Sequence, residues 1–116
     1  MNPRDLVQAV MRGDDLAARQ WVKDARRSGM DFSEVQDLGL TGDERVVAAA
    51  LFELLAVRQG KQPAAWTATA GIASKPVFLL KDAETSPAMR RLSVRGTPAS
   101  MRARNVFALR DYLDVL

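Results

Sequence analysis

The chain has 116 residues, of which 47% are hydrophobic and 27% are charged, and this is ordinary globular composition. We expect residues 1–116 to form a single helical domain. It contains no cysteine and no histidine, which excludes disulfides, Cys/His zinc sites, histidine-ligated haem and catalytic devices built on either residue. The net charge is +3, but residues 1–62 hold nine basic and ten acidic side chains, whereas residues 63–116 hold eight basic and four acidic ones. A basic excess confined to the second half of the chain favours an anionic partner.

Two helices are predicted at the start of the chain. Asn2 followed by Pro3 is a typical helix start, and the first helix should run to about Arg12. Asp14 is placed to cap a second helix, which Gly29 ends. The apolar residues of this second helix follow the i, i+3, i+4, i+7 pattern, which predicts one buried face: Ala18, Trp21, Val22 and Ala25.

The most apolar segment is predicted to be the central helix of the fold. Thr41 and Glu44 have the spacing of a capping box, and the helix that they open spans about 42–59. Its apolar residues lie on most sides of the helix axis: Val46, Val47, Leu51, Phe52, Leu54, Leu55 and Val57. A helix of this kind is enclosed by other elements, so we expect a mainly α fold, a compact helical bundle around it. Before it, Ser33 to Gln36 has the same capping-box spacing and predicts a short helical turn that ends at Gly39.

Shorter elements are predicted after residue 60. Residues 63–70 are expected to form a short helix. Two more are predicted over 87–95 and 98–104, because a serine or threonine precedes proline at each start. All three are consistent with a mainly α fold.

Short apolar runs at 77–80 and 106–108 leave two options open. They pair as a minor two-stranded β element, or residues 76–80 are coil. A last turn is predicted over 110–115, and we expect the apolar C-terminus, residues 113–116, to be buried. An exposed C-terminus acting as a docking peptide or dimer contact is the alternative.

Six arginines lie in a stretch with no acidic residue before Asp111: Arg90, Arg91, Arg95, Arg102, Arg104 and Arg110. Arg91 and Arg95 share a helix face, where like charges repel by about 0.2–0.5 kcal/mol unless an anionic group lies opposite. These six are the predicted partner-binding residues, and the expected partner is an acidic protein surface, for example that of a toxin or regulator. Nucleic-acid phosphates are the alternative partner. A third possibility is internal pairing with acidic residues elsewhere in the fold: Asp43, Glu44, Glu53 or Asp82.

The motifs of nucleic-acid binding are weak in this stretch. Binding of single strands favours interleaved aromatic side chains, which are few here. If Gly96 is aligned with the turn glycine of a helix-turn-helix, Leu92 stands where a small residue is required. Arg91 and Arg102 then stand at positions that should be apolar. A standard helix-turn-helix is therefore not predicted.

No catalytic, cofactor-binding or metal-ligating residue is predicted, and the protein is expected not to be an enzyme. Adjacent acidic residues occur at Asp14-Asp15 and Asp43-Glu44, both at predicted helix starts, where acidic groups stabilise the helix dipole. Neither Gly-rich phosphate loop, GxGxxG or GxxxxGK[ST], is present. An enzyme that uses carboxylates alone is the third class left open. The single aromatic residues are expected to pack in the core: Trp21, Trp66 and Phe78.

We expect a cytoplasmic protein without membrane contact. No signal peptide is visible, and the longest apolar stretch, Val46–Val57, is shorter than the roughly 20 residues that span a bilayer. The oligomeric state is left open, with a homodimer as one option.

Several short motifs follow one another after the central helix: Pro63-Ala64-Ala65-Trp66, Pro76-Val77-Phe78, Ser86-Pro87, Thr97-Pro98-Ala99 and Arg102-Ala103-Arg104-Asn105-Val106-Phe107. Through these motifs, residues from about 46 to 116 resemble the C-terminal region of a group of uncharacterised bacterial proteins. Several of that group are antitoxin-like regulators with an N-terminal helix-turn-helix. The resemblance implies a non-catalytic bacterial protein-interaction module, antitoxin-like or adaptor-like. No helix-turn-helix is readable in the first 45 residues, so the resemblance does not imply DNA binding.

Overall fold

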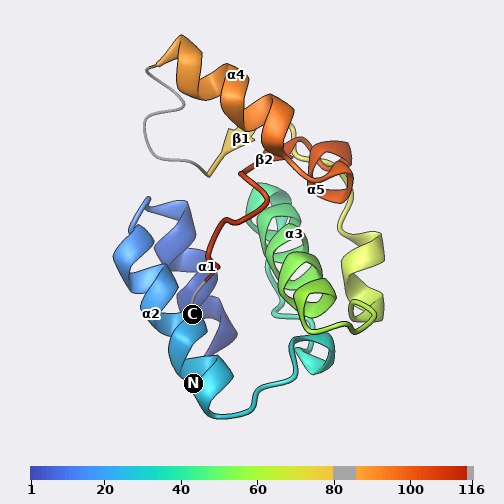
Figure 1. The fold of residues 1–116 in the computed structure, drawn as a ribbon. Coiled ribbons are helices and arrows are strands. Elements are labelled where there is room, and N and C mark those ends of the chain that lie inside the picture. Colours follow the sequence, from blue (N-terminus) through green and yellow to red (C-terminus); the bar gives the residue numbers. More distant parts are fainter. Residues whose placement is uncertain (80–85, 115–116) are drawn as a thin grey trace.

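The computed structural model describes residues 1–79 and 86–114 (Figure 1). Within these residues the fold is mainly α, as predicted. It has five α-helices, two short 3-10 helices and one two-stranded sheet. The radius of gyration is 13.1 Å, close to the roughly 13 Å of a compact chain of about this length. In chain order the elements are α1 (Pro3–Met11), α2 (Asp15–Arg27), η1 (Phe32–Glu34), α3 (Gly42–Arg58), η2 (Ala65–Thr69), β1 (Val77–Phe78), α4 (Pro87–Gly96), α5 (Ala99–Ala103) and β2 (Val106–Phe107).

The N-terminal helical hairpin is capped as the sequence predicts. The Asn2 side chain accepts a hydrogen bond from the backbone N–H two residues on, at 3.0 Å. The Asp14 side chain accepts one from the backbone N–H three residues on, also at 3.0 Å. Gly29, two residues beyond the end of α2, has a φ of +79°, and after it the Met30 N–H donates to the Ala25 carbonyl at 3.0 Å. This is a Schellman ending, which satisfies the last carbonyls of the helix.

Both predicted capping boxes are wrong. The short turn begins before Ser33 and ends at Glu34 instead of Gly39. Its cap is Asp31, whose carboxylate accepts from the Ser33 N–H at 2.9 Å and from the Ser33 hydroxyl at 2.5 Å. Thr41 lies at the N-cap of α3, but its side chain makes no capping hydrogen bond. The chain enters α3 through Gly42 at φ +60°, so the glycine conformation sets the start of this helix.

α3 lies at the centre of the fold, as its apolar composition predicts. It packs against α1, η1, η2, α5 and β2. An aromatic cluster connects it to α2 and η1, because the rings of Trp21, Phe32 and Phe52 lie 6.3–6.4 Å apart. Each such pair contributes about 0.5–1.5 kcal/mol beyond its burial. The buried residues of α3 are Val46, Val47, Ala48, Ala49, Ala50, Leu51, Phe52, Leu55 and Ala56.

The minor sheet is present, and its two strands are parallel. Val77 pairs with Val106, and Phe78 pairs with Phe107. The two phenylalanine rings stack with centroids 5.2 Å apart. The strands are shorter than the predicted 77–80 and 106–108, and residue 80 lies outside the described residues.

The segment after β2 runs between the α1–α2 hairpin and α3 (Figure 1). Leu113 on it is 1% exposed, which confirms the predicted burial for this residue, and Tyr112 beside it is 8% exposed. The segment forms turns, with Leu113 at a φ of +58°. Residues 115 and 116 lie outside the described residues.

Candidate functional site

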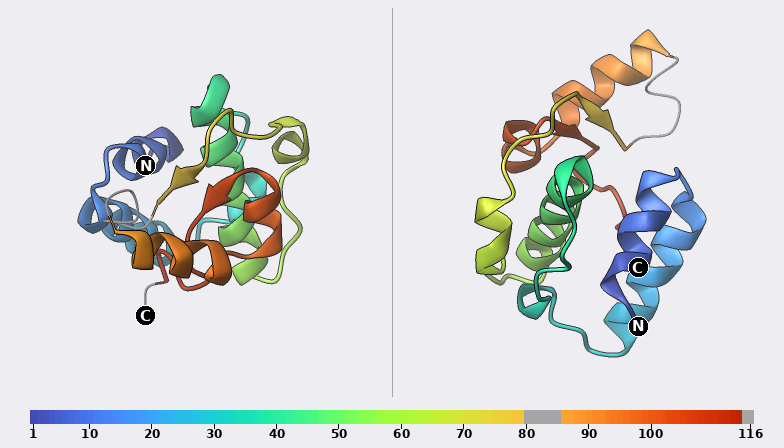
Figure 2. Two further views of the ribbon diagram at one scale, coloured as in Figure 1. Left: turned by 90° about the horizontal axis from the view of Figure 1, so that it is seen from above. Right: turned by 180° about the vertical axis from the view of Figure 1, so that it is seen from behind.

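α4 stands at one end of the molecule, beyond the ends of α1, α2 and α3 (Figures 1 and 2). Its one buried residue is Ser93, which lies on the face turned toward the rest of the chain. The exposed residues of the helix include two large apolar side chains, Leu92 at 49% and Val94 at 38%. Arg91 and Arg95 lie between these two on the helix surface and are also exposed. α4 therefore presents an outward face of mixed arginine and apolar character.

A buried threonine fixes the C-terminal end of α4. Thr97 is 2% exposed, and its hydroxyl donates to the Ser93 carbonyl. The same hydroxyl accepts a hydrogen bond from the Ala108 N–H at 3.1 Å. Next to it, Gly96 packs so closely on Leu109 that a Cβ at this position would lie 2.6 Å from Leu109 Cδ2. These contacts hold α4 against the segment that follows β2.

A groove of about 640 Å³ opens beside this contact, and three of the six predicted arginines line it. Arg95 comes from the last turn of α4, Arg102 from α5, and Arg110 from the segment after β2. The Arg102 Nη2 donates to the Thr97 carbonyl at 2.8 Å, which orients its guanidinium group. The rest of the lining is Gly96, Thr97, Pro98, Ala99, Leu109 and Asp111. We call this the arginine groove.

The other three predicted arginines lie elsewhere. Arg104 turns inward and pairs with Glu53 at 2.7 Å, which realises for this residue the internal pairing left open by the sequence. Arg90 lies over the Phe78 ring, with its guanidinium carbon 5.4 Å from the ring centroid. Arg91 is on the outward face of α4. The structure thus divides a cluster that is continuous in sequence into an outward face, the arginine groove, an internal pair and a contact with Phe78. Arg95 belongs to both the outward face and the groove.

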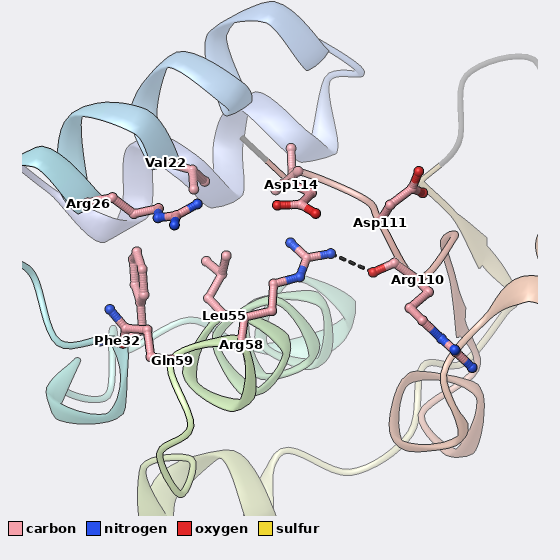
Figure 3. A pocket seen from close by; sticks show the side chains of 10 residues that line it. Val22, Arg26, Phe32, Leu55, Arg58, Gln59, Arg110, Asp111 and Asp114 are labelled. Carbon is pink, nitrogen blue, oxygen red and sulfur yellow. Dashed lines mark hydrogen bonds between the residues drawn. The ribbon is translucent and has the colours of Figure 1, made fainter. Parts of the chain in front are cut away.

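A second cavity of about 460 Å³ was not predicted (Figure 3). It lies between α2, η1, α3 and the segment after β2. Its apolar wall is formed by Val22, Phe32, Leu55 and Leu113, and its polar lining by Arg26, Arg58, Gln59, Arg110, Asp111 and Asp114. No local pattern in the sequence predicts it, because its lining comes from four segments that meet only in the fold.

Arg58, which lines the second cavity, connects α3 to the segment that carries Arg110 of the arginine groove. The Arg58 Nη2 donates to the Arg110 carbonyl at 2.6 Å, as Figure 3 shows. Burial lowers the pKa of Arg58, and the nearby carboxylates of Asp114 and Asp111 act in the opposite direction. This contact fixes the backbone from which the Arg110 side chain extends.

The adjacent acidic residues and the single aromatic residues noted in the sequence make structural contacts. Asp43 accepts hydrogen bonds from the Ser74 N–H at 3.0 Å and from the Ser74 hydroxyl. Trp21 and Trp66 pack against the core, and the Trp66 Nε1 donates to the Val35 carbonyl at 2.8 Å. Across the described residues, no three acidic side chains are grouped so that they could hold a metal ion.

None of the helices in residues 1–79 and 86–114 is long and apolar enough to cross a bilayer. No protein-family model, curated protein or solved structure matches this chain.

Proposed function

We propose that this protein is a non-catalytic interaction module, antitoxin-like or adaptor-like, that binds an acidic protein surface through the outward face of α4. One observation carries the proposal. Arg91 and Arg95 stand beside the exposed Leu92 and Val94 on a helix whose opposite face is packed. Arginine is enriched at protein-binding surfaces, and a protein partner can cover the apolar side chains that stand beside it.

The apolar residues favour a protein over a nucleic acid. Phosphate contacts need only the arginines, whereas a protein partner can also cover Leu92 and Val94. Burying the exposed part of these two side chains contributes about 1 kcal/mol each, and the arginines select an acidic partner.

The test is capture of partners from a lysate of the native host, after nuclease treatment, with three forms of the protein. The wild type is compared with Arg91→Ser/Arg95→Ser, which removes the charge of the outward face. The matched control is Arg19→Ser/Arg27→Ser, which removes the same charge from exposed positions on α2. We expect one acidic protein to be retained by the wild type and the control but lost from the α4 variant.

A single apolar substitution tests the mode of contact. Leu92→Ser keeps every charge, so a purely electrostatic interaction would retain the partner, whereas the proposed surface loses most of it. Equal loss with the α2 control, or no loss with either α4 variant, contradicts the proposal.

Nucleic acid is the second candidate, favoured by the density of arginines around α4 and α5. Its signature is a steep salt dependence, with the binding constant falling about 0.9 log units per log unit of salt for each phosphate contacted on B-DNA. Arg91→Ser/Arg95→Ser should then reduce the slope by about two. Binding that nuclease abolishes would favour this candidate over the protein partner.

A further inference from the structure

The arginine groove has features that the outward face of α4 lacks. Three arginines from three separate segments line one concavity, Arg95 from α4, Arg102 from α5 and Arg110 from the segment after β2. Guanidinium groups present several N–H donors in a plane and pair bidentately with phosphate oxygens. These three arginines lie around one groove because the fold brings their segments together.

Hydrogen bonds hold one guanidinium group and one backbone segment of the groove in position. The Arg102 guanidinium is tied to the Thr97 carbonyl at 2.8 Å, and Thr97 is itself buried and hydrogen bonded to the Ala108 N–H. The backbone of Arg110 is tied to Arg58 at 2.6 Å. A ligand therefore meets arginines whose backbones are already fixed, which lowers the ordering cost of binding.

The charge of the groove selects among anions. Three arginines and one aspartate, Asp111, give it a net charge of +2. A phosphate monoester carries about −1.5 to −2 at pH 7, which matches this charge. A single carboxylate would neutralise only half of it.

The walls of the groove suit an organic group attached to the phosphate. Pro98 and Leu109 contribute apolar surface, and the volume of about 640 Å³ lies within the roughly 300–1,000 Å³ of small-molecule sites. Inorganic phosphate would leave these walls uncovered.

We propose that the arginine groove binds a phosphate monoester, with Arg95, Arg102 and Arg110 as the phosphate ligands. The proposal goes beyond the protein partner of α4, because Arg102 and Arg110 are not on the outward face of that helix. The monoester comes from a small molecule or from a phosphorylated side chain of another protein, and the chemistry of the site is the same for both.

The experiment uses two probes, phenyl phosphate and a short phosphoserine peptide, with binding followed by calorimetry and by NMR of the arginine Nε–H groups. We expect the resonances of Arg95, Arg102 and Arg110 to shift together in one saturable transition, while that of Arg91 stays in place. Tighter binding of the peptide identifies a phosphorylated protein as the source, and equal or weaker binding identifies a small molecule.

Four variants test the assignment. Arg102→Gln and Arg110→Gln should each weaken binding about tenfold, because each removes charged donors to the phosphate. Arg91→Gln is the control, since it removes the same charge outside the groove, and it should change the affinity less than about twofold. Asp111→Asn should tighten binding, because it removes the opposing charge.

Three results would overturn the proposal. One is a uniform shift of all exposed arginines that follows ionic strength alone. Another is acetate binding as tightly as phenyl phosphate, and the third is equal weakening by Arg91→Gln and Arg102→Gln. The NMR mapping is done on the wild type, so it decides the matter even if a variant folds poorly. Phosphate binding that survives Leu92→Ser, with partner capture lost, separates this site from the proposed function.

Discussion

Arg104 donates to both carboxylate oxygens of Glu53, from Nε to Oε1 at 2.7 Å and from Nη2 to Oε2 at 3.1 Å. Their side chains are 12% and 17% exposed. Further donors of Arg104 reach the Gly71 carbonyl at 2.9 Å and the Thr67 carbonyl at 2.5 Å. One guanidinium group thus joins the middle of α3 to η2, to the loop after it and to the end of α5. Its role is to hold the C-terminal elements on α3.

Removing one member of this pair should destabilise the fold strongly. Glu53→Ala leaves a nearly buried guanidinium without its counter-ion, and we expect a loss of about 2–3 kcal/mol in the free energy of unfolding. Urea unfolding followed by circular dichroism measures it. Replacing both residues by leucine should recover part of the loss, because no unpaired charge is then left in the interior.

The ion pair between Arg45 and Asp37 is the control for that measurement. Its atoms lie equally close, at 2.7 Å, but the Asp37 side chain is 47% exposed. Solvent screens such a pair, so Asp37→Ala should cost much less than Glu53→Ala. Equal costs would contradict the role assigned to burial.

The sequence predicts a contact well when the two interacting residues lie close together along the chain, and poorly when they lie far apart. Asn2, Asp14 and Gly29 act on backbone groups within a few positions, and all three helix ends were predicted correctly. The contact of Glu53 with Arg104 spans 51 positions, and no local pattern distinguishes Glu53 from the other candidate partners. The capping box predicted at Thr41 is absent for a different reason. The chain enters α3 through Gly42 at a φ of +60°, and the Thr41 side chain makes no capping hydrogen bond there.

The site was predicted as a set of residues but not as a shape. The sequence groups six arginines by their closeness along the chain, whereas the helical turn of α4 sends Arg91 outward and Arg90 over an aromatic ring. The arginine groove needs Arg110, whose position depends on the path of the buried segment around Tyr112. Such a path is fixed by packing with distant elements.

The ion pair between Asp31 and Lys61 makes stability depend on pH in the acid range. The hydrogen bond from Lys61, followed by that from Ser33, lowers the pKa of Asp31 from 3.8 to about 2. The unfolded chain takes up this proton first, so the stabilisation is complete above pH 3.8 and is lost as the pH falls toward 2. Urea unfolding across this range should show a steeper decline for the wild type than for Asp31→Asn.

Lys61→Met is the companion variant. It removes the main cause of the shift, so the pKa of Asp31, measured by NMR of its carboxyl carbon, should rise toward its ordinary value. A wild-type pKa already at the ordinary value would contradict the ion pair. Asp37 and Asp43 also have lowered pKa values, because of Arg45 and Ser74 respectively, and they account for the acid sensitivity left in Asp31→Asn.

The close approach of Gly96 to Leu109 can be tested by a double-mutant cycle. Alanine at the last position of α4 should stabilise the helix, but its Cβ would meet Leu109 Cδ2 at 2.6 Å. We expect Gly96→Ala to be destabilising in the wild type and stabilising when combined with Leu109→Ala, with a coupling of about 1 kcal/mol. Thermal unfolding of the four forms gives the coupling, and additive effects would show that the end of α4 does not rest on Leu109.

Tyr112 is the one tyrosine of the chain, so its ionisation can be followed alone by ultraviolet absorbance. Its hydroxyl is buried and has no hydrogen-bond partner among the described residues. Burial raises the pKa of Tyr112 above 10.0, with a further rise from Asp15 and an opposing effect of Arg19. The unfolded chain therefore ionises first, and the folded state loses stability as the pH rises beyond 10.0.

We expect the tyrosinate absorbance to appear together with the loss of helical circular dichroism, and not before it. Tyr112→Phe should resist unfolding to a higher pH, because it has no proton to lose. At neutral pH this variant should differ from the wild type by less than about 1 kcal/mol, since the hydroxyl makes no hydrogen bond with any described residue. Ionisation of Tyr112 near pH 10.0 in a protein that keeps its full helical signal would mean that the segment after β2 is open to solvent. In that case the segment that carries Arg110 of the arginine groove would not hold a fixed position.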